Sequence, residues 1–138
     1  MNPLQDITFK HFSVNGATAG TKEFDCLNAD YLVVQFFTSG GSDAAMDTLK
    51  LQESDASGSG QADISGTDLT STVTSPAAVA ADDGCAVYIV DLRGRKRYIT
   101  ISFDGPANSA NSVAAFTLND QRPITAADAD WQGRVVVI

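Results

Sequence analysis

Apolar and polar residues alternate with a period of two along most of this chain, which is the pattern of half-buried β-strands. Turn-forming residues such as Asn15-Gly16 separate the alternating segments at intervals of about 8–15 residues. Near residues 10–12 the alternation changes phase, which predicts a β-bulge. The pattern predicts strands over residues 7–14, 23–27, 31–38, 48–53, 85–92, 97–103, 112–118 and 134–138.

Eight or nine short strands predict an all-β fold, an antiparallel β-sandwich of jelly-roll-like type. Periodicity alone does not separate a jelly roll from other Greek-key sandwiches. We expect one domain, with residues 1–22 as an N-terminal arm and first strand and residues 23–138 as the sandwich. Residues 54–84 are rich in Ser, Gly and Asp and predict long, variable surface loops with short strands near 62–64 and 69–73. Helical periodicity is weak, with short candidates at 42–47 and 125–131.

The strands at 85–92 and 97–103 predict a β-hairpin. Gly94 suits the first central position of a type II′ turn between them. This register places Leu92 opposite Arg97 and Tyr88 opposite Ile101. Each strand then has one apolar side and one mixed side, so the hairpin is expected to bury the apolar side.

Composition narrows the function classes. The chain has 138 residues, of which 17 are acidic and 9 basic, so its formal net charge is −8. A strongly acidic chain is a poor nucleic-acid binder, because neutralising phosphates requires a basic surface. No apolar run is as long as a membrane span. The first ten residues lack a signal-peptide pattern, and we expect a cytoplasmic product. Cys26 and Cys85 are expected to be buried thiols rather than a disulfide.

Candidate catalytic chemistry is sparse, and we expect no enzyme. His11 is the single histidine, so a Ser/His/Asp site would have to use it. A structural or surface role for His11 is favoured over a catalytic base. Gly58-Ser59-Gly60 is not followed by the lysine and helix of a phosphate-binding loop.

A metal site is also weakly supported, and no cofactor is expected. Asp55, Asp63 and Asp68 lie in a Gly/Ser-rich stretch and could offer oxygen ligands to Ca²⁺. Counted from Asp55, however, the twelfth position of an EF-hand loop is Gly66, where that motif needs glutamate. Solvated loop carboxylates are the favoured interpretation. One histidine and two distant cysteines do not suit zinc.

Four of the nine basic residues fall within five positions, and we call Arg93, Arg95, Lys96 and Arg97 the basic cluster. The rest of the chain has five bases against 17 acids, a balance of −12. Two interpretations stay open. The cluster can pair with the protein's own carboxylates, of which Asp91 is nearest in sequence. Alternatively it is a cationic tip that docks on an acidic partner, with Arg95 at its apex; Arg97 is expected to pair internally in either case.

Four segments resemble a family of small tailed-phage structural proteins that are encoded near the major capsid protein and regarded as capsid decoration, or cement, proteins. The likeness covers about residues 30–138, in the same order along the chain. The segments are Thr48-Leu-Lys-Leu-Gln-Glu-Ser-Asp55, Ala62-Asp-Ile-Ser-Gly-Thr67, Asp91-Leu-Arg-Gly-Arg-Lys-Arg-Tyr-Ile99 and Ile124-Thr-Ala-Ala-Asp128.

The resemblance implies a non-enzymatic β-sandwich that binds the exterior of the virion capsid, with the major capsid protein as partner and often as a homotrimer. No catalytic residues come with this family. Three segments are candidates for the shell-facing surface: the N-terminal arm over Met1–Phe12, the Arg93–Arg97 tip with Arg93, Arg95 and Lys96, and the strand at 134–138. The arm is the first choice, because an apolar extension can add as an edge strand to a neighbour. Its apolar residues are Leu4, Ile7, Phe9 and Phe12.

Other classes remain as alternatives. One is a different virion β-sandwich, such as a head-fibre base, a tail-associated protein or a carbohydrate-binding module. A glycan binder should present exposed aromatic side chains, yet Trp131 is the only tryptophan. An enzyme that depends on His11 is the second alternative.

Overall fold

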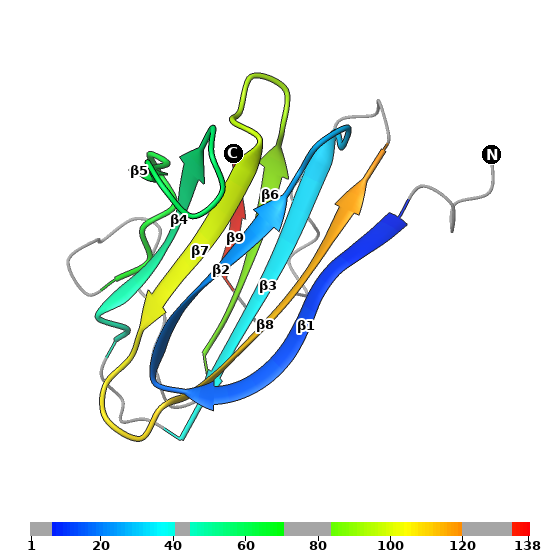
Figure 1. The fold of residues 1–138 in the computed structure, drawn as a ribbon. Coiled ribbons are helices and arrows are strands. Elements are labelled where there is room, and N and C mark those ends of the chain that lie inside the picture. The colour runs from blue at the N-terminus through cyan, green and yellow to red at the C-terminus, as the bar shows by residue number, and fades with distance from the viewer. Residues whose placement is uncertain (1–6, 41–44, 71–83, 120–133) are drawn as a thin grey trace.

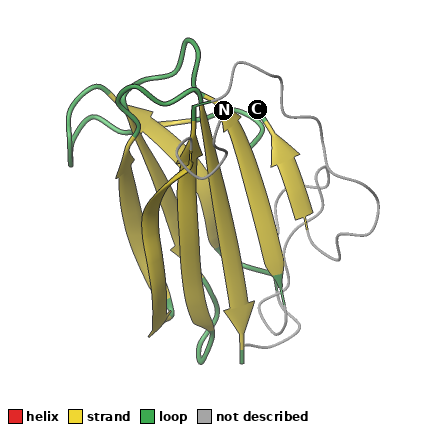
Figure 2. Ribbon diagram, turned by 90° about the vertical axis from the view of Figure 1, so that its right-hand side faces the viewer, coloured by secondary structure: helices red, strands yellow, loops and turns green. Residues whose placement is uncertain are grey.

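Two β-sheets pack face to face in this protein, as a computed structural model shows for residues 7–40, 45–70, 84–119 and 134–138 (Figures 1 and 2). These residues contain no helix. The predicted all-β sandwich is therefore confirmed. The strands are β1 (Ile7–Ala17), β2 (Ala19–Asp25), β3 (Tyr31–Ser39), β4 (Thr48–Ser54), β5 (Ala62–Asp63), β6 (Cys85–Asp91), β7 (Tyr98–Asp104), β8 (Ala110–Leu118) and β9 (Arg134–Val137).

One sheet has five strands in the order β1-β8-β3-β6-β9, and the other has four in the order β2-β7-β4-β5. All neighbours are antiparallel except β6 and β9, which run parallel. The chain passes from the first sheet to the second between β1 and β2 (Figure 1). At this corner the carbonyl of Thr18 accepts hydrogen bonds from Gly105 N (3.0 Å) and Asn111 Nδ2 (2.8 Å). These bonds fasten the crossing to the β7–β8 connection.

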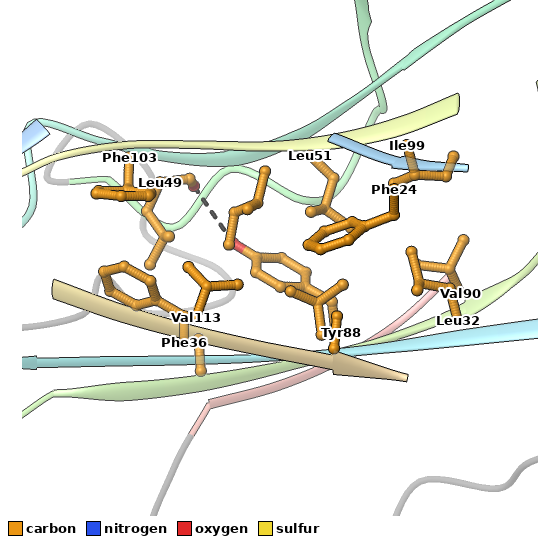
Figure 3. Packing of buried hydrophobic residues seen from close by; sticks show 14 of the residues in the cluster. Phe24, Leu32, Phe36, Leu49, Leu51, Tyr88, Val90, Ile99, Phe103 and Val113 are labelled. Atoms are coloured by element: carbon orange, nitrogen blue, oxygen red, sulfur yellow. Dashed lines mark hydrogen bonds between the residues drawn. The ribbon is translucent and has the colours of Figure 1, made fainter. Parts of the chain in front are cut away.

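The core is formed by alternate residues of facing strands (Figure 3). On β8, for example, every second residue from Asn111 to Thr117 is buried and the others are partly exposed. Because successive side chains of a strand point to opposite faces, this period marks one side of each sheet as the core side. The largest fully buried side chains are Tyr88, Phe24, Phe36, Leu32, Met46, Leu49, Leu51, Leu69, Ile99, Ile101, Val34 and Val90.

The predicted hairpin between residues 85–92 and 97–103 is wrong. β6 pairs with β3 and β9 in the five-stranded sheet, whereas β7 pairs with β2 and β4 in the other sheet. The connection is thus an arch between sheets. The sides predicted to be buried are buried, with Tyr88 and Ile101 both fully inside, but Val87, Ile89 and Thr100 on the opposite sides are buried as well. Alternation identifies the apolar side of each strand but not whether two apolar sides lie next to each other or face each other.

The turn in this arch also differs from the predicted type. Arg95 N donates to Leu92 O (3.0 Å), so Gly94 is the third residue of the turn rather than the second. Gly94 has a φ of +85°, as a type II turn requires at this position. Glycine is favoured there because a Cβ is strained at positive φ.

Residues 54–70 are more regular than the predicted loose loops. Thr67 is fully buried, and its hydroxyl donates to Ile64 O (2.8 Å) and accepts from Leu51 N (3.0 Å). The Glu23 carboxylate accepts from Ser57 Oγ (2.6 Å) and Gly58 N (2.8 Å), which ties this loop to β2. The hydrogen bond from Gly58 is the main reason that the pKa of Glu23 is lowered.

The remaining local predictions have mixed outcomes. The short strand near 62–64 is confirmed as β5, and the bulge as a register shift between Phe9 and His11. Of the expected strand at 69–73, the described residues 69–70 are not in a strand, and of the expected helix at 42–47, residues 45–47 are not helical. The remaining residues of both segments and the helical candidate at 125–131 lie outside the described residues. Cys26 is buried, Cys85 is half-buried, and they form no disulfide.

Candidate binding surfaces

The basic cluster lies on the arch between β6 and β7, and all four of its cations contact carboxylates of this chain. Arg93 also donates to Tyr31 Oη (3.2 Å) and lies over its ring. The ion pairs are Arg93 with Asp91, Arg95 with Glu53 (3.8 Å), Lys96 with Asp55 (3.0 Å) and Arg97 with Asp25 (2.7 Å).

Each positive charge of the basic cluster is therefore compensated by a neighbouring carboxylate. The hydrogen bond from Arg93 lowers the pKa of Asp91 from 3.8 to about 2. The carboxylates of Asp91 and Asp25 raise the pKa values of Arg93 and Arg97, respectively. The expected internal pairing of Asp91 and of Arg97 is confirmed. An outside contact of Arg93, Arg95 or Lys96 stays a prediction.

The carboxylates considered for Ca²⁺ are also engaged elsewhere. Asp63 accepts from Lys50 Nζ and Gln52 Nε2, both at 2.7 Å, and these bonds lower its pKa. Asp55 pairs with Lys96, and Asp68 accepts a hydrogen bond from Thr70 N (3.0 Å). Within the described ranges, no three side chains of the types that ligate metals are gathered.

The N-terminal candidate segment forms β1, which is an edge strand of the protein's own five-stranded sheet. β1 pairs with β8, with Ile7 opposite Leu118, Phe9 opposite Phe116 and Phe12 opposite Ala114, whereas Leu4 lies outside the described residues. The register shifts between Phe9 and His11 and again between Val14 and Ala17. Bulges and lysines are devices that discourage an exposed edge from accepting another strand, and Lys10 lies at the first bulge. The edge of β1 is thus a poorer docking strand than its apolar sequence predicted.

The C-terminal candidate is bonded into the sheet. β9 pairs with β6, and the register places Val135 beside Val87 and Val137 beside Ile89. Beyond β9, Ile138 N donates to Ile89 O (2.9 Å) and its carbonyl accepts from Asp91 N (2.7 Å). This segment completes the five-stranded sheet on the side opposite β1.

The outer side of the four-stranded sheet is polar. Its strands contain five acids and two bases, and on β7 the outward residues Tyr98, Ser102 and Asp104 are at least partly exposed, whereas Thr100 between them is buried. An ion pair joins Lys50 to Asp63 across neighbouring strands of this sheet. Such a side is typical of a sheet surface that faces water.

The outer side of the five-stranded sheet is apolar, and we call it the outer apolar face. Its strands contain one acid and two bases. Val33, Val87 and Ile89 form a second cluster of buried side chains there, 7–8% exposed, with the partly exposed Phe116 and Leu118 packed against it. These residues point away from the main core, because Leu32, Val34, Tyr88 and Val90 beside them point into it.

Sequence reasoning missed this face, although β3 carried a signal for it. The segment Tyr31-Leu-Val-Val-Gln-Phe-Phe37 is apolar at both even and odd positions, so both sides of its strand are apolar. Leu32, Val34 and Phe36 fill the core, whereas Phe37 keeps 48% of its surface exposed. Leu27, in the turn before β3, is the other large hydrophobic residue exposed in the described chain, at 56%.

Comparisons with known proteins do not identify a family. No family model matches the chain, and neither a curated protein nor a solved structure matches it. In the part of the chain that the structure describes, there is no helix that could span a membrane.

Proposed function

We propose that this protein is a non-enzymatic virion structural protein that binds the outer surface of a phage capsid and stabilises the shell by bridging major capsid subunits. The observation that carries the proposal is the contrast between its two outer sides. One is polar and acidic, and the other holds a second apolar cluster that the main core does not use. Interfaces are depleted of charged residues at their centres, so the exposed apolar side chains of this face, Phe37 together with the partly exposed Phe116 and Leu118, are the favoured contact surface.

The sequence resemblance to capsid decoration proteins supports the same proposal. It supplies the class of partner, whereas the fold supplies a rigid sandwich on which one side can bind and the other remain hydrated. The homotrimer and the exterior virion location come from the resemblance alone.

Stabilisation would arise from many copies on one lattice. A standard protein interface buries about 1,600 Å² in total, and each copy would divide such an area between neighbouring capsid subunits. Expansion of the shell would then have to break these contacts at many sites together. Multivalent binding of this kind does not require a single tight site.

Co-sedimentation of the purified protein with mature, undecorated shells tests the proposal. We expect binding that saturates at a fixed ratio to capsid subunits. Absence of binding at physiological salt would overturn it. Binding to a glycan array, with no binding to shells, would favour a carbohydrate-binding module instead.

Substitutions in the basic cluster test the competing surface. Arg95 and Lys96 already pair with Glu53 and Asp55, so Arg95→Gln with Lys96→Gln should leave shell binding unchanged. Stability should fall only slightly, because exposed ion pairs contribute little. A tenfold or greater loss of shell binding by a folded double variant would assign the contact to the basic cluster.

A further inference from the structure

We infer that residues 55–60 form a strap that closes over the outer side of β7, and that the carboxylate of Glu23 holds this strap closed. The strap begins where β4 ends, at Ser54, and all of its residues are exposed. Ser57 and Gly58 in the strap bind Glu23 on β2. Because β7 lies between β4 and β2, the strap has to cross β7 to reach this carboxylate.

The burial of Thr100 marks the place where the strap crosses. In the register of the three strands, Thr100 lies between Glu23 and Gln52 and points to the outer side of the sheet, as Ser102 does. Side chains on this polar side are expected to face water, and Ser102 is partly exposed. Thr100, however, is only 4% exposed. The strap accounts for the difference, because it is bonded to the neighbour of Thr100 on β2.

The closed position depends on a small number of bonds. The Glu23 carboxylate accepts from Ser57 Oγ at 2.6 Å and from Gly58 N at 2.8 Å. Hydrogen bonds with a charged acceptor are stronger than those between neutral groups. The Thr100 hydroxyl has no hydrogen-bond partner among the described residues, so it adds no bond to the strap. Glu23 is therefore the main attachment of the strap to the strands that it crosses.

The other contacts of the strap allow it to open as a unit. Asp55 pairs with Lys96 (3.0 Å) at the end next to β4, which fixes the position where the strap begins. A β-bridge between Ala56 and Ser59 lies within the strap and keeps its shape. Local opening breaks few contacts in such a segment and leaves the core of the sandwich intact. Loss of the Glu23 carboxylate should thus expose the outer side of β7 without unfolding the protein.

Thiol labelling at position 100 measures this opening. Thr100→Cys places a thiol under the strap, so its reaction with iodoacetamide, located by mass spectrometry, requires the strap to open. We expect slow labelling in this variant. Adding Glu23→Gln should make it about 10- to 100-fold faster, because a neutral amide replaces the charged acceptor. Adding Ser57→Ala instead removes one of the two bonds and should give a smaller increase.

Asp63→Asn is the matched control. Asp63 is a carboxylate on the same side of the sheet, but it binds Lys50 and Gln52 rather than the strap. Adding this substitution should leave labelling at position 100 unchanged. Cys26 is buried in the core and separates local opening from unfolding, so it should stay unlabelled in every variant.

Four results would overturn the inference. The first is labelling at position 100 that is as fast as that of an exposed cysteine while Glu23 is still present. The second is labelling that Glu23→Gln leaves unchanged, and the third is an equal effect of Asp63→Asn. The fourth is labelling of Cys26 that rises together with labelling at position 100.

Hydrogen exchange of the Gly58 amide gives a second readout in a chain that keeps Thr100. In Glu23→Gln this amide loses its charged acceptor, and its exchange should be about 10-fold faster or more. An unchanged exchange rate would also overturn the inference. These measurements use the isolated protein without shells, so their outcome is independent of the proposed function.

Discussion

The hydroxyl of Tyr88 offers the sharpest test of how the sandwich is held together. Tyr88 belongs to the five-stranded sheet, is fully buried, and reaches across the core to the other layer (Figure 3). Its hydroxyl lies 3.0 Å from Thr67 O and 3.4 Å from Leu49 O. Burial raises the pKa of Tyr88, so the hydroxyl stays protonated and can donate. Tyr88→Phe removes this donor and retains the ring.

The expected cost follows from the two acceptors. Leu49 O already accepts from Leu69 N at 2.9 Å, so it loses little when the hydroxyl is removed. Thr67 O is buried and loses the shorter of the two hydrogen bonds that the Tyr88 hydroxyl donates. A net hydrogen bond is worth about 1 kcal/mol, and a buried group left without a partner adds about 1–2 kcal/mol. We therefore expect Tyr88→Phe to lower the free energy of unfolding by about 2 kcal/mol.

Urea unfolding measures this change, provided that the m-value matches that of the wild type. Tyr98→Phe is the control, because Tyr98 is partly exposed on the polar side and its ring keeps its contact with Arg97. Its effect should stay within about 0.5 kcal/mol. If Tyr88→Phe is as stable as the wild type, the hydroxyl does not tie the loop of Thr67 to the five-stranded sheet, and this reasoning is refuted.

Four other substitutions give three separate tests by urea unfolding. Thr67→Val should lower the free energy of unfolding by about 2–3 kcal/mol, because it removes hydrogen bonds to two buried backbone groups. Thr100→Val should leave the free energy of unfolding unchanged, because the buried hydroxyl of Thr100 has no hydrogen-bond partner among the described residues. Equal losses of stability in the two variants would contradict both assignments. Gly105→Ala should cost about 1–3 kcal/mol, because its Cβ would lie 2.3 Å from Ser109 Oγ, and a neutral result would mean that Ser109 moves freely. The pKa of Asp91 is lowered to about 2 in the folded protein, so its stabilising effect should be complete well above pH 3.8 and disappear as the pH falls to about 2. The stability difference between wild type and Asp91→Asn should shrink over that range, and a difference that is constant with pH would contradict the ion pair.

Strand positions and buried sides could be predicted from this sequence, because alternation is a local property. The pairing of β6 and β7 could not. Four residues with a glycine between two amphipathic strands fit a hairpin, yet here Gly94 belongs to an arch between sheets. The deciding factor is which distant strands pair with each of them. β3 supplies the neighbour of β6, and β2 and β4 supply those of β7.

The same distinction applies to the candidate surfaces. The pair between Arg93 and Asp91 could be anticipated, because the two residues are two positions apart. The partner of Arg97 is Asp25, which is 72 positions away and reaches it only because β2 lies beside β7. Compensation of the basic cluster is therefore a result of tertiary structure. In the sequence, only the segment that forms β3 indicated the outer apolar face. The extent of that face depends on the order of the five strands in the sheet, which the sequence pattern does not give.

The pairing of β1 with β8 has a consequence for biosynthesis. Ile7 lies opposite Leu118, so β1 cannot pair with β8 until all the strands between them have been translated. Until then its backbone groups and those of β3 have no sheet neighbour on the β8 side. Sheets built from such distant segments fold slowly and are prone to aggregate during synthesis. We expect nascent chains that stop before residue 110 to be sensitive to proteases and to be bound by chaperones.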